Sequence, residues 1–323
     1  MKRHFLGWTA LLAGCSVSVA AQSSTDVAAT HDGLMGSLYG TLVPGDIQNG
    51  PAVLIIPGSG PTDRDGNNPL GVRAASYRLL AERLAERGIT TLRIDKRGMF
   101  ASAGATENAN DVTIETYVAD THAWSAVLRS ETGNDCVWLL GHSEGALIAL
   151  ASVADRSDGI CGVILAASPG RPLGAILREQ FKANPANASI LDDAEKAISQ
   201  LEAGEDIAAN ELPPVLLPIF GPQIQRFMKS MLAQDPAAMI ADYTGPVLIL
   251  HPQEDIQVAL SDAQALQSAQ VDAELVILEQ VNHVLKQVPP GDRAVNLRSY
   301  SDASLPIAPA VTEAITEFVT RAR

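Results

Sequence analysis

The chain has 323 residues, of which 46% are hydrophobic, and it carries a formal net charge of −14. This length and hydrophobic content are sufficient for one large core, and the acidic balance disfavours binding to nucleic acid or anionic membranes. No Cys/His cluster has zinc-ligand spacing, and no phosphate-binding loop or dinucleotide fingerprint occurs, so we expect neither a metal nor a cofactor.

The N-terminus has the pattern of a secretory signal. Two basic residues, Lys2 and Arg3, precede a mostly apolar stretch over 5–21, after which polar residues begin. We predict a signal peptide over 1–21 and a mature protein that is periplasmic or secreted. The alternative is lipoprotein anchoring at Cys15, whose preceding residues resemble a lipobox. The apolar run before Cys15 is short and continues beyond it, which favours plain secretion.

Along the remaining chain, short apolar runs alternate with helical patterns. This order predicts a mostly parallel sheet flanked by helices. Strands are expected at 38–43, 52–57, 90–94, 136–140, 162–167, 246–250 and 274–278. Helices are expected at 76–87, 113–129, 146–153 and 310–320.

The alternation stops after the strand at 162–167. Residues 169–243 have the pattern of several helices, and we expect them to form a helical lid over the active site. The lid would then divide the hydrolase core into a first part over 22–168 and a second part over 244–323. The alternative is a helical excursion packed against the side of the domain.

Residues 141–145 read Gly-His-Ser-Glu-Gly, a G-x-S-x-G pattern between a predicted buried strand and a helix that is apolar on all sides. Strand, tight turn and helix together are the context of a nucleophile elbow. Such a turn holds its serine in a strained backbone conformation, and the residues two positions away must be very small. We therefore predict that Ser143 is a catalytic nucleophile rather than an incidental turn serine.

A nucleophilic serine needs a base, and the base needs an acid to orient it. Among six histidines, His283 follows the last predicted strand, at the carboxyl edge of the sheet, and fits the chain order Ser, acid, His. The penultimate strand is followed by two adjacent carboxylates, Glu254 and Asp255, of which we select Asp255. His251, at the end of that strand, is a further candidate for the site.

The loop after the strand at 52–57 is expected to supply half of an oxyanion hole. The candidate donors are the backbone N–H groups of Ser59 and of Glu144, the residue after the nucleophile. Glycines on both sides of Ser59 permit the close backbone approach that this role demands. Residues 63–65 either contact substrate or form a local ion-pair and turn network, and we favour the network.

These motifs together resemble the α/β-hydrolase superfamily, and more narrowly the exported bacterial hydrolases grouped with the serine aminopeptidase-like esterases. The matching segments are 57–67, 95–98, 141–145, 255–258 and 282–286. The resemblance implies the α/β-hydrolase fold, a mostly parallel eight-stranded sheet flanked by helices with a helical lid inserted after strand six. It also implies a triad of Ser143, Asp255 and His283. Phe100 departs from the family pattern, since a glycine usually stands there.

We expect a serine hydrolase that cleaves carboxylic esters of short to medium acyl chain through an acyl-enzyme, with a small-molecule ester as its partner. Apolar side chains within 169–243 would line the acyl pocket. One alternative is an aminopeptidase or amidase on the same triad, with an acidic residue of that segment holding a free amino terminus. A second is a catalytically silent binding protein with this fold, against which the complete Ser, Asp and His set argues.

Two cysteines, Cys136 and Cys161, remain after removal of the predicted signal. Each lies seven residues before a serine that ends a strand, Ser143 and Ser168. Because consecutive parallel strands are neighbours, both sulfurs should lie at the edge of the sheet opposite the active site. An oxidising compartment permits a bond between them. We predict a Cys136–Cys161 disulfide, with two buried free thiols as the alternative.

Overall fold

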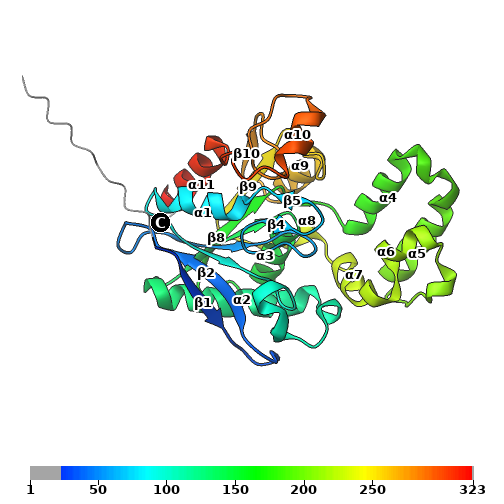
Figure 1. Cartoon of the computed structure of the whole chain (residues 1–323), viewed down its shortest axis with the longest axis horizontal. Coiled ribbons are helices and arrows are strands. Elements are labelled where there is room, and N and C mark those ends of the chain that lie inside the picture. The colour runs from blue at the N-terminus through cyan, green and yellow to red at the C-terminus, as the bar shows by residue number, and fades with distance from the viewer. Residues whose placement is uncertain (1–22, 322–323) are drawn as a thin grey trace, which may run out of the picture.

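The computed structural model describes residues 23–321, so the predicted signal peptide and Cys15 lie outside the described residues. One eight-stranded sheet forms its centre, with helices on both faces (Figure 1). In sheet order the strands are β1 (Thr25–Ala29), β2 (Leu38–Val43), β6 (Thr90–Ile94), β3 (Ala52–Ile56), β7 (Val137–His142), β8 (Ile160–Ala166), β9 (Val247–Pro252) and β10 (Glu274–Leu278). β2 pairs antiparallel with β1 and β6, and all other neighbours are parallel. The predicted mostly parallel eight-stranded sheet is confirmed.

All seven predicted strands are present. The side chains of β3, β6 and β7 are buried along the whole strand, because central strands of a parallel sheet are covered on both faces. In β3 and β7 this double burial produces continuous apolar runs that make the strands recognisable, whereas β6 also buries Thr90, Thr91 and Arg93. The eighth strand, β1, escapes prediction because it is an edge strand on which four of five residues are exposed or half-buried.

Helices pack on the sheet in two layers. One face is covered by α1 (Ser76–Ala85) and α11 (Pro309–Arg321), and the other by α2 (Ile114–Thr132), α3 (Glu144–Asp155) and α9 (Leu260–Ala269). Side chains alternate between the faces along a strand. In β3, Val53 and Ile55 therefore belong to the core beneath α1 and α11, whereas Leu54 and Ile56 belong to the core beneath α2 and α3.

Between β8 and β9 the described chain forms helices and turns. The helices are α4 (Leu173–Ala183), α5 (Leu191–Glu202), α6 (Leu217–Phe220), α7 (Gln225–Leu232) and α8 (Pro236–Asp242). α4 to α7 project from the sheet domain and share a small core that includes Phe181, Ile198 and Phe220 (Figure 1). α8 instead packs against α3 and α9. Within residues 23–321, no helix is both long enough and apolar enough to cross a membrane.

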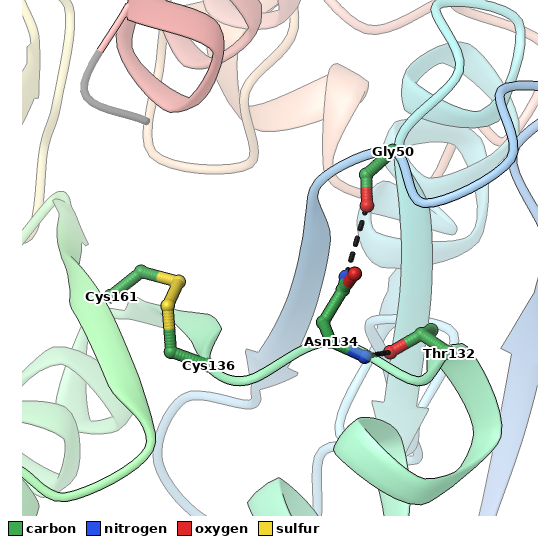
Figure 2. Close-up of a disulfide and its surroundings, with 5 residues drawn as sticks. All are labelled: Gly50, Thr132, Asn134, Cys136 and Cys161. Carbon is green, nitrogen blue, oxygen red and sulfur yellow. Dashed lines mark hydrogen bonds between the residues drawn. A yellow bond between two sulfur atoms is a disulfide. The ribbon is translucent and has the colours of Figure 1, made fainter.

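Cys136 and Cys161 form a disulfide, with their Cα atoms 5.2 Å apart, in agreement with the predicted pairing (Figure 2). The pairing of β7 with β8 shifts by one residue at this point, so the two cysteines are not related by a simple equal offset. Close by, the side-chain amide of Asn134 donates a 3.0 Å hydrogen bond to the Gly50 carbonyl, just before β3 (Figure 2). The amino end of β7 is thereby tied to the strands on both sides.

Candidate active site

Ser143 stands at the tight turn between β7 and α3, with φ 54° and ψ −120°. A non-glycine residue in this region is strained. A Cβ on Gly141 would lie 2.2 Å from the carbonyl oxygen of Gly145, and a Cβ on Gly145 would lie 2.2 Å from that of Ile56. Both flanking positions therefore require glycine. The Ser143 N–H donates to the Ala166 carbonyl at 2.9 Å, which fixes the turn to the end of β8.

His283 and Asp255 are brought together from the loops after β10 and β9. His283 Nδ1 lies 2.7 Å from Asp255 Oδ2, and the two side chains are 6% and 0% exposed. The second oxygen of Asp255 accepts two N–H groups of its own loop, at 2.7 and 3.0 Å. Glu254 instead accepts the Gly291 N–H at 2.9 Å. Of the two adjacent carboxylates, the geometry therefore pairs Asp255 with the imidazole.

Competing effects set the ionisation of Asp255. Burial alone would raise the pKa of its carboxyl, but the charge and hydrogen bond of His283 and the two backbone N–H groups lower that pKa below its ordinary value. Asp255 is therefore ionised at neutral pH and accepts the Nδ1–H of His283. This hydrogen bond fixes the tautomer in which Nε2 is the basic nitrogen.

Ser143 and His283 line the same cavity, of about 140 Å³, at the carboxyl edge of the sheet. The hairpin of β4 (Asn67–Asn68) and β5 (Val72–Arg73) contributes one wall. Other lining side chains include Ser59, Thr62, Asn68, Tyr77, Gln257 and Tyr300. Among the described residues that line it, none is Asp, Glu, Lys or Arg. The space beside Ser143 is therefore suited to an uncharged group.

A second cavity, of about 250 Å³, adjoins the first, since Gln257 lines both. α4 contributes Glu179 to its wall. Arg171 pairs with Glu179 and, at 2.9 Å, with Asp262, so the charges in this groove are largely matched within the protein.

The two residues predicted to donate to an oxyanion lie beside Ser143. Ser59 lines the Ser143 cavity, and Glu144 is the first residue of α3. Neither backbone N–H donates to an acceptor within residues 23–321. The first N–H groups of a helix have no intrahelical acceptor. Both groups are thus available to a substrate oxygen.

A hydrogen-bond chain that the sequence did not reveal runs behind this cavity. The Gly58 N–H donates to Tyr77 Oη at 3.0 Å, Tyr77 Oη lies 2.9 Å from His142 Nδ1, and His142 Nε2 lies 2.8 Å from the His283 carbonyl. Burial, reinforced by His283, lowers the pKa of His142 to about 3. The neutral ring therefore accepts from Tyr77 Oη and donates to the His283 carbonyl, which links the loop after β3 to the His283 loop.

A buried ion pair between Lys96 and Glu144 is a second feature to which the sequence assigned no role. Lys96 Nζ lies 2.8 Å from Glu144 Oε1, and the two side chains are 3% and 2% exposed. The same ammonium donates to the Gly58 carbonyl at 2.7 Å. Lys96 belongs to the Asp-Lys-Arg-Gly segment over 95–98, which matches the family pattern but predicts no chemical role.

Other polar candidates lie outside the cavity. Asp65 pairs with Arg93, and Arg64 pairs with Asp95 at 3.2 Å, so this loop forms a local ion-pair network. His251 is buried and does not line the Ser143 cavity. Within residues 23–321, no group of three or more His, Cys, Asp or Glu side chains is arranged to hold a metal ion.

The family model described as serine aminopeptidase, S33, matches residues 70–287, which is more than half of the chain. The chain belongs to this family of α/β hydrolases. The matched region includes Ser143, Asp255 and His283. The predicted resemblance to the serine aminopeptidase-like α/β hydrolases is confirmed.

Comparison with individual proteins agrees with this assignment. Esterase EstD from Thermotoga maritima is 27% identical over 243 residues, which are 73% of this chain and 54% of that protein. The chain therefore spans about half the length of this curated relative. Among solved structures, Est1E from Butyrivibrio proteoclasticus has a TM-score of 0.57 at 19% identity and covers 92% of this chain and 98% of its own. The α/β hydrolase GrgF from Penicillium sp. sh18 has a TM-score of 0.60 at 21% identity, with 93% and 99% covered. These likenesses show the α/β-hydrolase fold.

Proposed function

We propose that the protein is a serine hydrolase that cleaves carboxylic esters of short to medium acyl chain through an acyl-enzyme. One observation carries this proposal: His283 is hydrogen-bonded to the buried Asp255 and lines the same cavity as Ser143. A serine on a strained turn, a base and an acid that orients the base are the parts needed to activate a hydroxyl for attack.

In this mechanism His283 Nε2 takes the proton of Ser143 while Oγ attacks the acyl carbon. The carbonyl electrons move to oxygen, and the backbone N–H groups of Ser59 and Glu144 stabilise the oxyanion. As the ester C–O bond breaks, His283 protonates the leaving alcohol and the acyl-enzyme forms. Water then attacks the acyl carbon and gives its proton to His283. His283 returns that proton to Ser143 as the acid is released.

The lining of the cavity supports a neutral ester as substrate. Its volume of about 140 Å³ suits a short or medium acyl group rather than a long lipid chain. The remainder of the substrate would extend past Gln257 into the adjoining groove, beneath the lid that we assign to residues 169–243. α4 supports this assignment, since its side chains line that groove.

An aminopeptidase is the second candidate, because the family bears that description. Such an enzyme needs a carboxylate that holds a free amino terminus beside the nucleophile. None of the described side chains that line the Ser143 cavity is a carboxylate. In the adjoining groove Glu179 and Asp262 are already paired with Arg171. These observations favour the esterase.

Export is the remaining part of the proposal. The signal pattern over 1–21 and the Cys136–Cys161 disulfide both suit an oxidising compartment outside the cytosol. The mass of the mature N-terminus in cell fractions tests it. A periplasmic or secreted form that begins at Gln22 is expected, and a lipid-modified Cys15 at the N-terminus would support lipoprotein anchoring instead.

A substrate panel tests the reaction class. We expect kcat/KM for nitrophenyl esters to peak at short or medium acyl length and to exceed that for every aminoacyl nitroanilide by orders of magnitude. Activated esters react with any serine hydrolase, so the amide half of the panel decides. Efficient turnover of an aminoacyl anilide would place the protein among the peptidases, and no turnover of either series would support a silent binding protein.

A further inference from the structure

Lys96 places a buried positive charge between the two halves of the oxyanion hole. Its ammonium donates to the Gly58 carbonyl at 2.7 Å and to Glu144 Oε1 at 2.8 Å. It also lies 5.3 Å from the centroid of the Tyr117 ring. The side chain is 3% exposed, so solvent does not compete for these contacts.

The contact with Gly58 determines the direction of the Ser59 N–H. The Gly58 carbonyl and the Ser59 N–H belong to one trans peptide, so they point in opposite directions. Because Lys96 holds the carbonyl, the Ser59 N–H must point away from the ammonium, and Ser59 lines the cavity. The Gly58 N–H is bound to Tyr77 Oη, so the peptide groups on both sides of the Gly58 Cα are held. A cation on the carbonyl also polarises the peptide and strengthens its N–H as a donor.

The contact with Glu144 holds the second donor. Glu144 is the first residue of α3, and its side chain is 2% exposed. Its backbone N–H is the other proposed oxyanion donor. One ammonium therefore sets the spacing between the loop after β3 and the start of α3.

Stability alone does not account for this pair. Burying two charges removes both from water, and a well-packed apolar pair in the same place is often as stable or more stable. We propose that Lys96 is a positioning residue for catalysis, which aligns the N–H groups of Ser59 and Glu144 on the developing oxyanion. This inference rests on the function proposed above.

The test uses a double variant, Lys96→Met/Glu144→Met, because Lys96→Met alone would leave a buried carboxylate without its partner. The double variant keeps both backbone N–H groups and should fold. Deleting one oxyanion-hole donor lowers kcat by ~10²–10³-fold. Misaligned donors keep part of this effect, so we expect kcat for a short-chain ester to fall about 10- to 100-fold. KM should be nearly unchanged.

Comparison of an ester with its thionoester gives a ratio of kcat values that would not change if Lys96 only stabilised the fold. The negative charge of a reacting thionoester develops on sulfur, which is larger and a weaker hydrogen-bond acceptor than oxygen. An aligned oxyanion hole therefore prefers the oxygen ester. The ratio of ester to thionoester kcat should fall in the double variant. Lys96→Gln retains an N–H donor without the charge, so both its kcat and this ratio should lie between those of the wild type and the double variant.

The neighbouring pair of Arg97 and Asp120 supplies a matched control. These side chains are also buried, at 8% and 6% exposed, and neither lines the Ser143 cavity. Neutralising them as Arg97→Met/Asp120→Leu should leave kcat and the thionoester ratio unchanged below the melting temperature of that variant.

The outcomes separate the inference from the function on which it rests. A wild type that turns over no ester would overturn the proposed function and this inference with it. An active wild type with unchanged kcat and thionoester ratio in the double variant would overturn the role of Lys96 alone. If the double variant does not fold, Lys96→Gln decides, since wild-type kcat and ratio in that variant contradict the role.

Discussion

His142 Nε2 donates a 2.8 Å hydrogen bond to the backbone carbonyl of His283, and the two rings lie 4.7 Å apart between centroids. The residue next to Ser143 thus supports the loop that holds the proposed base. Its other nitrogen accepts from Tyr77 Oη, which in turn holds the Gly58 N–H. A single neutral ring therefore couples the position of His283 to that of the loop after β3, which carries the proposed oxyanion donor Ser59.

The first prediction concerns this ring. His142→Phe removes both hydrogen bonds and leaves the His283 carbonyl without its donor, which should cost about 1–3 kcal/mol of unfolding free energy. We expect kcat to fall about tenfold or more with little change in KM, because the bonds position catalytic groups rather than the bound ester. Denaturant melts and ester kinetics measure both effects. The control is Thr41→Ser on β2, which does not line the Ser143 cavity and keeps a hydroxyl at this position, so kcat should be unchanged.

The second prediction concerns stability against acid. Burial lowers the pKa of His142 from its ordinary 6.5 to about 3, so the folded protein excludes a proton that the unfolded chain binds. Stability is then complete above about pH 6.5 and falls as the pH drops toward 3. The pKa of Asp255 is also lowered in the folded state, so protonation of this carboxylate causes a further loss of folding stability below about pH 4. His142→Gln removes the titrating ring, so its melting temperature should depend less steeply on pH between 6.5 and 4. Parallel curves for the two proteins would contradict this role of His142.

Much of the fold follows from the sequence. β3, β7 and β9 are central strands buried on both faces, which leaves continuous apolar runs in the chain. The chain order Ser143, Asp255, His283, each residue after a strand end, also predicts three side chains that the structure brings to one edge of the sheet.

The supporting contacts around the site could not be predicted in the same way. Tyr77 is 65 residues from His142, and Lys96 is 48 residues from Glu144, so no local pattern links them. Phe100 illustrates a different limit. Its φ is 47°, in the left-handed region that favours glycine, which explains the glycine usual at this position. The sequence alone does not reveal this backbone conformation.

The third prediction distinguishes the two adjacent carboxylates. Asp255→Asn should lower kcat by about 10⁴-fold, because an amide does not stabilise the imidazolium and favours the wrong tautomer of His283. Glu254→Gln should have a far smaller effect, since that side chain bonds to the Gly291 N–H instead. Steady-state kinetics on one nitrophenyl ester rank the two variants. The reverse ranking would show that Glu254 is the acid.

The fourth prediction concerns the disulfide. Cys136 and Cys161 are 25 residues apart, and closing a loop of this size restricts the unfolded chain by about 3 kcal/mol. The double variant Cys136→Ala/Cys161→Ala should lose stability of that order and keep its kcat, because the bond lies at the opposite edge of the sheet from Ser143. Thiol titration of the unfolded, unreduced mature chain should detect no free thiol. Two titratable thiols would contradict the bond.

The central claim is that Ser143 is the nucleophile of an ester hydrolase. Its most direct test is mass spectrometry of the protein after reaction with a nitrophenyl alkylphosphonate. The oxygen of an activated serine attacks the phosphorus, nitrophenolate leaves, and the serine stays phosphonylated. One phosphonyl group should appear on the peptide that contains Ser143, and esterase activity should fall in proportion to labelling. The Ser143→Ala protein, folded as judged by its melting curve, should be neither labelled nor active. Labelling at another residue, or full activity in Ser143→Ala, would contradict the assignment.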